Sequence, residues 1–204
     1  MRSPDAIAAA LGMLSYPRMA HKARRFPLPK GITFLLEIAA AEPDALRDAV
    51  SITGRSEPTL RKAAGFFIEQ VMLDEKADYY RMLGASPSAP AEDIRRHMAL
   101  IMRWLHPDLV MDHERDGGFN RSLYANRVIA AWDALKSQSR RSAYDSTRLR
   151  GEPDTAPPKP GDRQPSLQPQ SSVPTGWQAM RPDSPARRRP AGLSQILNLF
   201  GFRL

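Results

Sequence analysis

Hydrophobic side chains recur every three to four residues between residues 31 and 76, and this is the spacing of one face of a helix. Two stripes follow the pattern: Ile32, Leu35, Leu36 and Ala39 in the first, and Leu60, Ala64, Phe67 and Val71 in the second. Between them, Pro43 suits the first turn of a helix and Gly54 suits its end. The pattern predicts a small unit of about three helices over residues 26–76, after a poorly defined segment over residues 1–25.

The next region predicts two longer helices that can pack on each other. Five apolar side chains share a face of the first, which starts near Pro90: Ile94, Met98, Ile101, Met102 and Leu105. Pro107 ends this helix because its ring removes an N–H group and disfavours helical geometry at His106. After a polar loop, a second helix over roughly residues 119–135 offers a facing stripe: Leu123, Val128, Ala131, Trp132 and Leu135. We expect an all-α fold in which these helices form an antiparallel hairpin with an exposed tip.

Four motifs in this region follow one another in a recognisable order. They are DYYRMLG from Asp78, EDIRRH from Glu92, LHPD from Leu105, and AWDALKSQSRRSAYD ending at Asp145. In sequence and in spacing they resemble the opening, the second helix, the loop and the ending of the J domain, the DnaJ-like co-chaperone module. The resemblance covers residues 77–148 and implies a helical hairpin with short flanking helices.

The resemblance also implies a function for the predicted tip. His106, Pro107 and Asp108 would form the loop that docks on a DnaK-type chaperone ATPase and stimulates its ATP hydrolysis. A carboxylate at Asp108 suits a charge-assisted bond to a basic group, and Pro107 restricts the loop. Arg95 and Arg96 stand where the family keeps basic residues that meet an acidic partner surface, although a plain solvated helix face would look the same.

Other positions depart from the family pattern. Leu109 and Val110 follow the loop where a basic residue and often Asn are usual, and Ala99 and Leu100 replace two usual basic residues. Arg103 is the remaining candidate for compensation. We therefore expect a specialised J-domain-only member, with an unknown client, that is tuned to one partner or stimulates it modestly. The alternative is a J-like scaffold that does not stimulate and binds mainly through its N-terminal unit or tail.

Two tryptophans belong to the long helices of the hairpin. Trp132 occupies a position where the family has a core Tyr, so we expect it in the core. Trp104 falls off the apolar stripe of its helix, and the sequence leaves open whether it is core or an exposed contact beside the loop.

Composition separates the tail from the rest. Residues 149–204 hold 10 of the 19 prolines, and their 8 basic and 4 acidic residues supply +4 of the net charge of +8. We predict a disordered Pro-rich linker over residues 149–190, because such a sequence cannot bury enough apolar surface to offset the entropy of ordering. Basicity is therefore a poor guide to the function of the helical region.

The chemistry of the side chains argues against several functional classes. The chain has no cysteine, which excludes disulfides, thiolate zinc sites and cysteine nucleophiles. Its four histidines lack metal-ligand spacing and it has no Gly-rich phosphate loop, so we expect neither an enzyme nor a cofactor. Nucleic-acid binding is disfavoured because aromatic residues are not interleaved with the tail arginines. We expect a cytoplasmic protein, with an organellar matrix as the alternative if the source is eukaryotic.

The last residues, 191–204, predict a short amphipathic helix. Three arginines precede a helically spaced apolar stripe: Arg187, Arg188 and Arg189, then Leu193, Ile196, Leu197 and Phe200. A helix of about two turns is not stable alone in water, so it would fold only against something. An anionic membrane surface, a partner groove and the N-terminal unit are candidate surfaces, and a frayed tail is the alternative.

Deletion of residues 187–204 tests this attachment hypothesis. We expect the truncated chain to lose co-sedimentation with anionic vesicles or retention of a protein partner in pull-downs, because both contacts would need the arginines and the stripe together. Unchanged behaviour in both assays would reduce the segment to a frayed tail.

Overall fold

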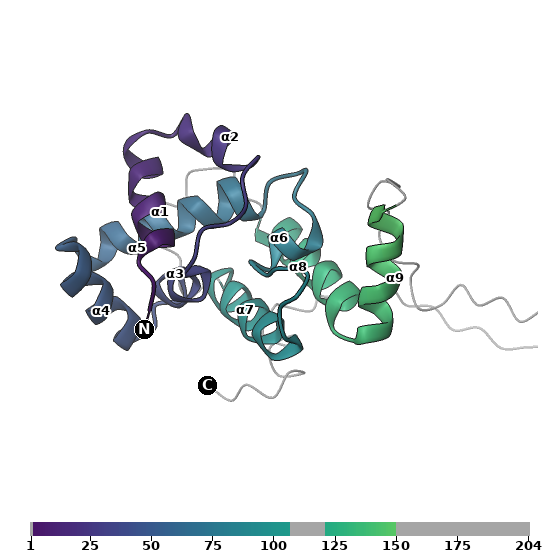
Figure 1. Ribbon diagram of the computed structural model, residues 1–204. Helices are drawn as coiled ribbons and strands as arrows, with labels where there is room; N and C mark the ends of the chain where they lie inside the picture. The colour runs from purple at the N-terminus through teal and green to yellow at the C-terminus, as the bar shows by residue number, and fades with distance from the viewer. Residues whose placement is uncertain (1, 107–120, 150–204) are drawn as a thin grey trace, which may run out of the picture. The chain divides into compact units, whose positions relative to one another are not determined.

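The computed structural model describes residues 2–106 and 121–149, and every regular element in these ranges is helical, which confirms the all-α class. The first six elements are α1 (Asp5–Ser15), α2 (Met19–Ala23), α3 (Ile32–Ala39), α4 (Pro43–Thr53), α5 (Glu57–Phe67) and the π-helical turn η1 (Ile68–Met72). The next four are α6 (Tyr79–Met82), α7 (Ala91–Trp104), α8 (Arg121–Leu135) and α9 (Gln138–Leu149) (Figure 1). The predictions for Pro107, Asp108, the linker and the C-terminal peptide lie outside the described residues.

The segment over residues 1–25 contains two helices that the sequence did not predict. Ala6, Ile7 and Ala10 of α1 are fully buried, and α1 packs against α5 and α3. Alanine side chains let a helix approach its neighbours closely, but they give only a weak hydrophobic pattern. This is why α1 belongs to the core without showing a clear amphipathic stripe.

α3 lies at the centre of the helical body, in contact with α1, α4, α5 and α7 (Figure 1). Every residue of this helix except Thr33 is buried, including Phe34 and Ile38 outside the predicted stripe. A helix that is apolar on nearly all sides is stable in water only when neighbours cover all of those sides. The prediction of a one-sided stripe was therefore too narrow.

The two following helices agree with their sequence signals. Pro43 begins α4, and Gly54 ends it in the left-handed conformation with φ of 64°. All four residues of the second predicted stripe are buried: Leu60, Ala64, Phe67 and Val71. Local chemistry is enough here because the end residues fix where each helix starts and stops.

The hairpin of α7 and α8 is built largely as its periodicity predicts. All five residues of the α7 stripe are buried: Ile94, Met98, Ile101, Met102 and Leu105. On α8, Val128, Ala131 and Leu135 are buried, whereas Trp132, which we expected in the core, is only half-buried. Leu123 is exposed, so its assignment to the shared stripe was wrong. It lies in the first turn of α8, and α8 contacts α6 and α9 as well as α7.

The N-terminal helices and the hairpin region belong to one compact unit. Gly84, the last residue of DYYRMLG, lies directly against the N-terminal helices: a Cβ at this position would be 2.6 Å from Ile32 Cγ2 and 3.0 Å from Met72 Cε. Its φ of 62° adds a second reason for glycine, since other residues rarely adopt it. The two sequence regions are thus joined by close packing rather than by a linker.

We predict that Gly84→Ala lowers the free energy of unfolding by about 2–4 kcal/mol, from the positive φ and from the clash with Ile32 together. Gly54→Ala is the matched control, because Gly54 has a similar φ and open space around its missing Cβ. That variant should lose only about 1–2 kcal/mol. Urea unfolding of both variants measures the difference, and equal losses would contradict close packing at Gly84.

Candidate docking site

The first and last motifs of the hairpin region bind each other. The ring of Tyr79 stacks on Tyr144 at a centroid distance of 4.7 Å, and the hydroxyl of Tyr80 donates to Asp145 at 2.9 Å. Burial, followed by this bond, raises the pKa of Tyr80 to about 12, so the phenol stays neutral and remains a donor. The carboxylate of Asp78 accepts from the backbone N–H at the end of the first turn of α6 at 2.7 Å. These contacts tie α6 to α9.

The end of α7 lies beside the start of α8. The guanidinium of Arg121 donates to the carbonyl of Trp104 at 3.2 Å, so the two helices run antiparallel. His106 follows α7 after one residue and is half-buried. The end of α7 and the start of α8 therefore lie at the same end of the helix pair.

The three arginines predicted to meet a partner do not share one face of α7. At 3.6 residues per turn, Arg96 and Arg103 project to nearly the same side, whereas Arg95 is turned by about 100° from Arg96. All three are exposed. Arg95 makes no ion pair with any of the described residues, in contrast to the other two.

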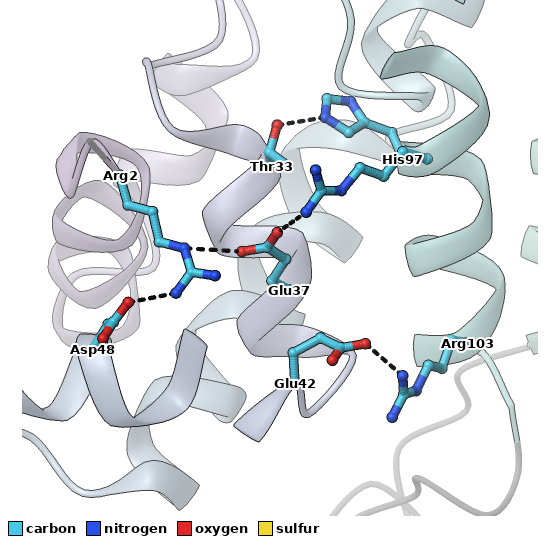
Figure 2. A network of polar contacts seen from close by, with 8 residues as sticks. Arg2, Thr33, Glu37, Glu42, Asp48, His97 and Arg103 are labelled. Carbon is cyan, nitrogen blue, oxygen red and sulfur yellow. Dashed lines mark hydrogen bonds and ion pairs between the residues drawn. The ribbon is translucent and has the colours of Figure 1, made fainter. Parts of the chain in front are cut away.

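Arg96 and Arg103 are bound by carboxylates of the N-terminal unit. Arg96 pairs with Glu37 of α3, and Arg103 pairs with Glu42, which directly precedes α4 (Figure 2). Arg2 reaches the other oxygen of Glu37 at 3.5 Å. Two of the three predicted docking cations therefore hold the chain to itself in this structure.

A buried histidine adds a third contact between α3 and α7. Nε2 of His97 lies 2.7 Å from the hydroxyl of Thr33, and Nδ1 lies 3.0 Å from the carbonyl of Leu83 (Figure 2). Because a carbonyl only accepts, Nδ1 carries the proton and Nε2 accepts from Thr33. Burial lowers the pKa of His97, and the Leu83 carbonyl offsets this only in part. The histidine is therefore held neutral inside the interface.

The packing of α7 on α3 accounts for some departures from the family pattern. His97, Leu100 and Trp104 are buried and lie within about 60° of one another around α7, on the side that meets Thr33. Leu100 replaces a usual basic residue at a position that this chain needs for burial. Trp104 is core, which answers the question that the sequence left open.

Sequence reasoning missed the carboxylates that bind the arginines. Glu37 stands as a single charge within the apolar run ITFLLEIAAA, and a charge in a buried helix is rarely left without a partner. That signal indicates a cationic partner for Glu37 but does not say which cation. The described residues contain no group of three or more metal-ligating side chains. Their helices are also too short or too polar to cross a bilayer.

The buried, neutral His97 predicts acid sensitivity. The pKa of His97 is lower in the folded chain than the ordinary value of about 6.5. At a pH between these two pKa values, the unfolded chain therefore binds more protons than the folded chain. The free energy of unfolding should therefore fall as the pH drops from about 6.5 towards the lowered pKa. His97→Gln should flatten this dependence between about pH 7 and 5.5, whereas His21→Gln, at an exposed site, should keep it. Parallel slopes for wild type and His97→Gln in urea titrations would refute the assignment.

Comparison with curated proteins finds DnaJ relatives. The chain is 34% identical over 68 residues to the chaperone protein DnaJ of Rickettsia typhi, covering 33% of this chain and 17% of that protein. It is 35% identical over 68 residues to the DnaJ of Orientia tsutsugamushi, with the same coverage. It is 30% identical over 91 residues to human DnaJ homolog subfamily C member 1, covering 45% of this chain and 15% of the relative.

No family model matches the chain, and no solved structure gives a significant match. The chain spans only about one sixth of the length of the curated relatives it matches. The matched length of 68 residues equals the length of the segment from Asp78 to Asp145 in which the four motifs occur, and the match of 91 residues is longer than that segment. The resemblance is therefore confirmed: over a third to 45% of its length this chain is homologous to DnaJ proteins, as expected for a chain with a J domain.

Proposed function

We propose that the chain is a J-domain co-chaperone that docks on a DnaK-type chaperone through His106, Pro107 and Asp108 and stimulates its ATP hydrolysis. The homology to DnaJ proteins supports this class of function. Its client is a separate protein that the flanking regions would select. The loop makes no chemical step of its own, because hydrolysis takes place on the partner.

The observation that carries the proposal is where His106 lies. It follows α7 after one residue, at the end of the hairpin where Arg121 begins α8. Because α7 and α8 pack on each other, His106 is held at one end of a packed helix pair, and a group that is held in place loses less entropy when a partner binds it. A carboxylate at Asp108 can then form a charge-assisted bond to a basic group of the ATPase.

The cations of α7 support a modest rather than a strong interaction. Arg95 is exposed and makes no ion pair among the described residues, so it can meet an acidic partner surface. Arg96 and Arg103 are already paired with carboxylates of the same chain. Fewer available charges should mainly slow association, because electrostatic complementarity acts on the association rate and on orientation.

Single-turnover ATP hydrolysis by the DnaK-type chaperone of the same organism tests the proposal. The wild-type chain should accelerate hydrolysis, and Asp108→Asn should abolish the acceleration because the loop loses its only carboxylate among residues 106–111. Asp133→Asn is the matched control, since it removes one exposed carboxylate from α8, away from the loop.

Equal rates with wild type and Asp108→Asn at saturating concentration would overturn the co-chaperone proposal. That result would favour the scaffold alternative, in which the J-like hairpin supports a binding element elsewhere in the chain. The scaffold alternative is supported by the ion pairs that Arg96 and Arg103 form with carboxylates of the same chain.

A further inference from the structure

The two ion pairs between α7 and the N-terminal unit differ in how readily they can open. The side chain of Glu37 is only 7% exposed and contacts Arg2 as well as Arg96. Withdrawing Arg96 would leave a buried carboxylate with less compensation, which is costly. The Glu37 pair is therefore part of the fold.

The pair of Glu42 and Arg103 lies in solvent. Their side chains are 38% and 47% exposed, and an exposed pair of this kind holds its partners only weakly. The Glu42 side chain makes no capping bond to α4, although Glu42 is the residue that precedes the helix. Opening this pair therefore leaves the helix end and the buried core intact.

Arg103 is also close to the proposed docking loop. It lies one helical turn before His106, and the backbone N–H of His106 donates to the carbonyl of Arg103 at 3.0 Å. A partner that holds the loop can reach the Arg103 guanidinium. In the free chain, the Glu42 carboxylate already occupies that guanidinium (Figure 2).

We infer that Glu42 is a specificity residue that competes with a carboxylate of the partner for Arg103. An acidic partner surface must displace Glu42 from Arg103. The displaced Glu42 carboxylate then stays nearby and repels other carboxylates of the partner. A surface that is acidic throughout is thus disfavoured, and one that places a carboxylate on Arg103 with a cation beside it is preferred. This inference rests on the proposed function, because it concerns docking on the same partner.

The test is the affinity of full-length variants for the DnaK-type chaperone of the same organism. Glu42→Gln should tighten binding by about two- to fivefold at low ionic strength, the range expected for one exposed ion pair, and the gain should shrink as salt is added. Asp44→Asn is the matched control. It removes an equally charged, exposed carboxylate two residues away that pairs with Arg47 of its own helix, and it should leave the affinity unchanged.

A second background separates competition from general charge. In chains that already carry Arg103→Gln, the substitution Glu42→Gln should give a clearly smaller gain than in the wild-type background, because only the repulsion by the unpaired carboxylate is then removed and the contested guanidinium is gone. An equal gain in that background, or no gain in the wild-type background, would overturn the inference.

Asp108→Asn distinguishes this failure from failure of the proposed function. If Asp108→Asn abolishes binding while Glu42→Gln changes nothing, docking stands and the competition does not. If Asp108→Asn binds as tightly as wild type, or if no chain binds, the proposed function fails and the inference fails with it.

Discussion

The burial of α3 between the other N-terminal helices and α7 is the constraint on which the structure depends. Leu35, Leu36 and Ile38 of this helix have no exposed surface, and a side chain of this size contributes about 1.5–3 kcal/mol when fully buried. Removing α7 would expose part of this surface and would also break the hydrogen bond between Thr33 and His97. The J-domain hairpin is therefore completed by the N-terminal helices.

This shared helix changes what the surface of the hairpin can offer a partner. One buried side of α7 packs on α3. At the edge of that side, Arg96 pairs with Glu37 and Arg103 pairs with Glu42. Arg96 and Arg103 are thus part of the contact between α7 and the N-terminal helices, whereas Arg95, turned by about 100° from Arg96, makes no ion pair among the described residues. The groups that this packing leaves accessible on α7 are therefore few.

Local signals in the sequence predicted the local structure well. Pro43 and Gly54 mark the ends of α4 because their effects on the backbone act within one turn. The stripes of α7 and α5 were predictable because helical periodicity is a short-range property. α1 escaped prediction because two of its four buried residues are alanine, which gives only a weak hydrophobic pattern, and η1 because a π-helical turn has no periodicity of its own in the sequence.

Long-range pairing could not be predicted in the same way. Glu37 and Arg96 are 59 residues apart, and Thr33 and His97 are 64 residues apart. Nothing in their neighbourhoods specifies the partner, so three arginines that look equivalent in the sequence have different roles in the structure. Leu100 and Trp104 could be seen as departures from a family pattern, but the reason became visible only with α3 beside them.

Native-state hydrogen exchange of α3 and α7 tests the central claim most directly, because it reports the free energy at which each helix opens. If the N-terminal helices complete the hairpin, the slowest amides of the two helices should exchange with the same opening free energy, equal to that of global unfolding. Exchange of α3 at a clearly lower free energy, with α7 still protected, would show that the hairpin stands without the N-terminal helices and would contradict the account.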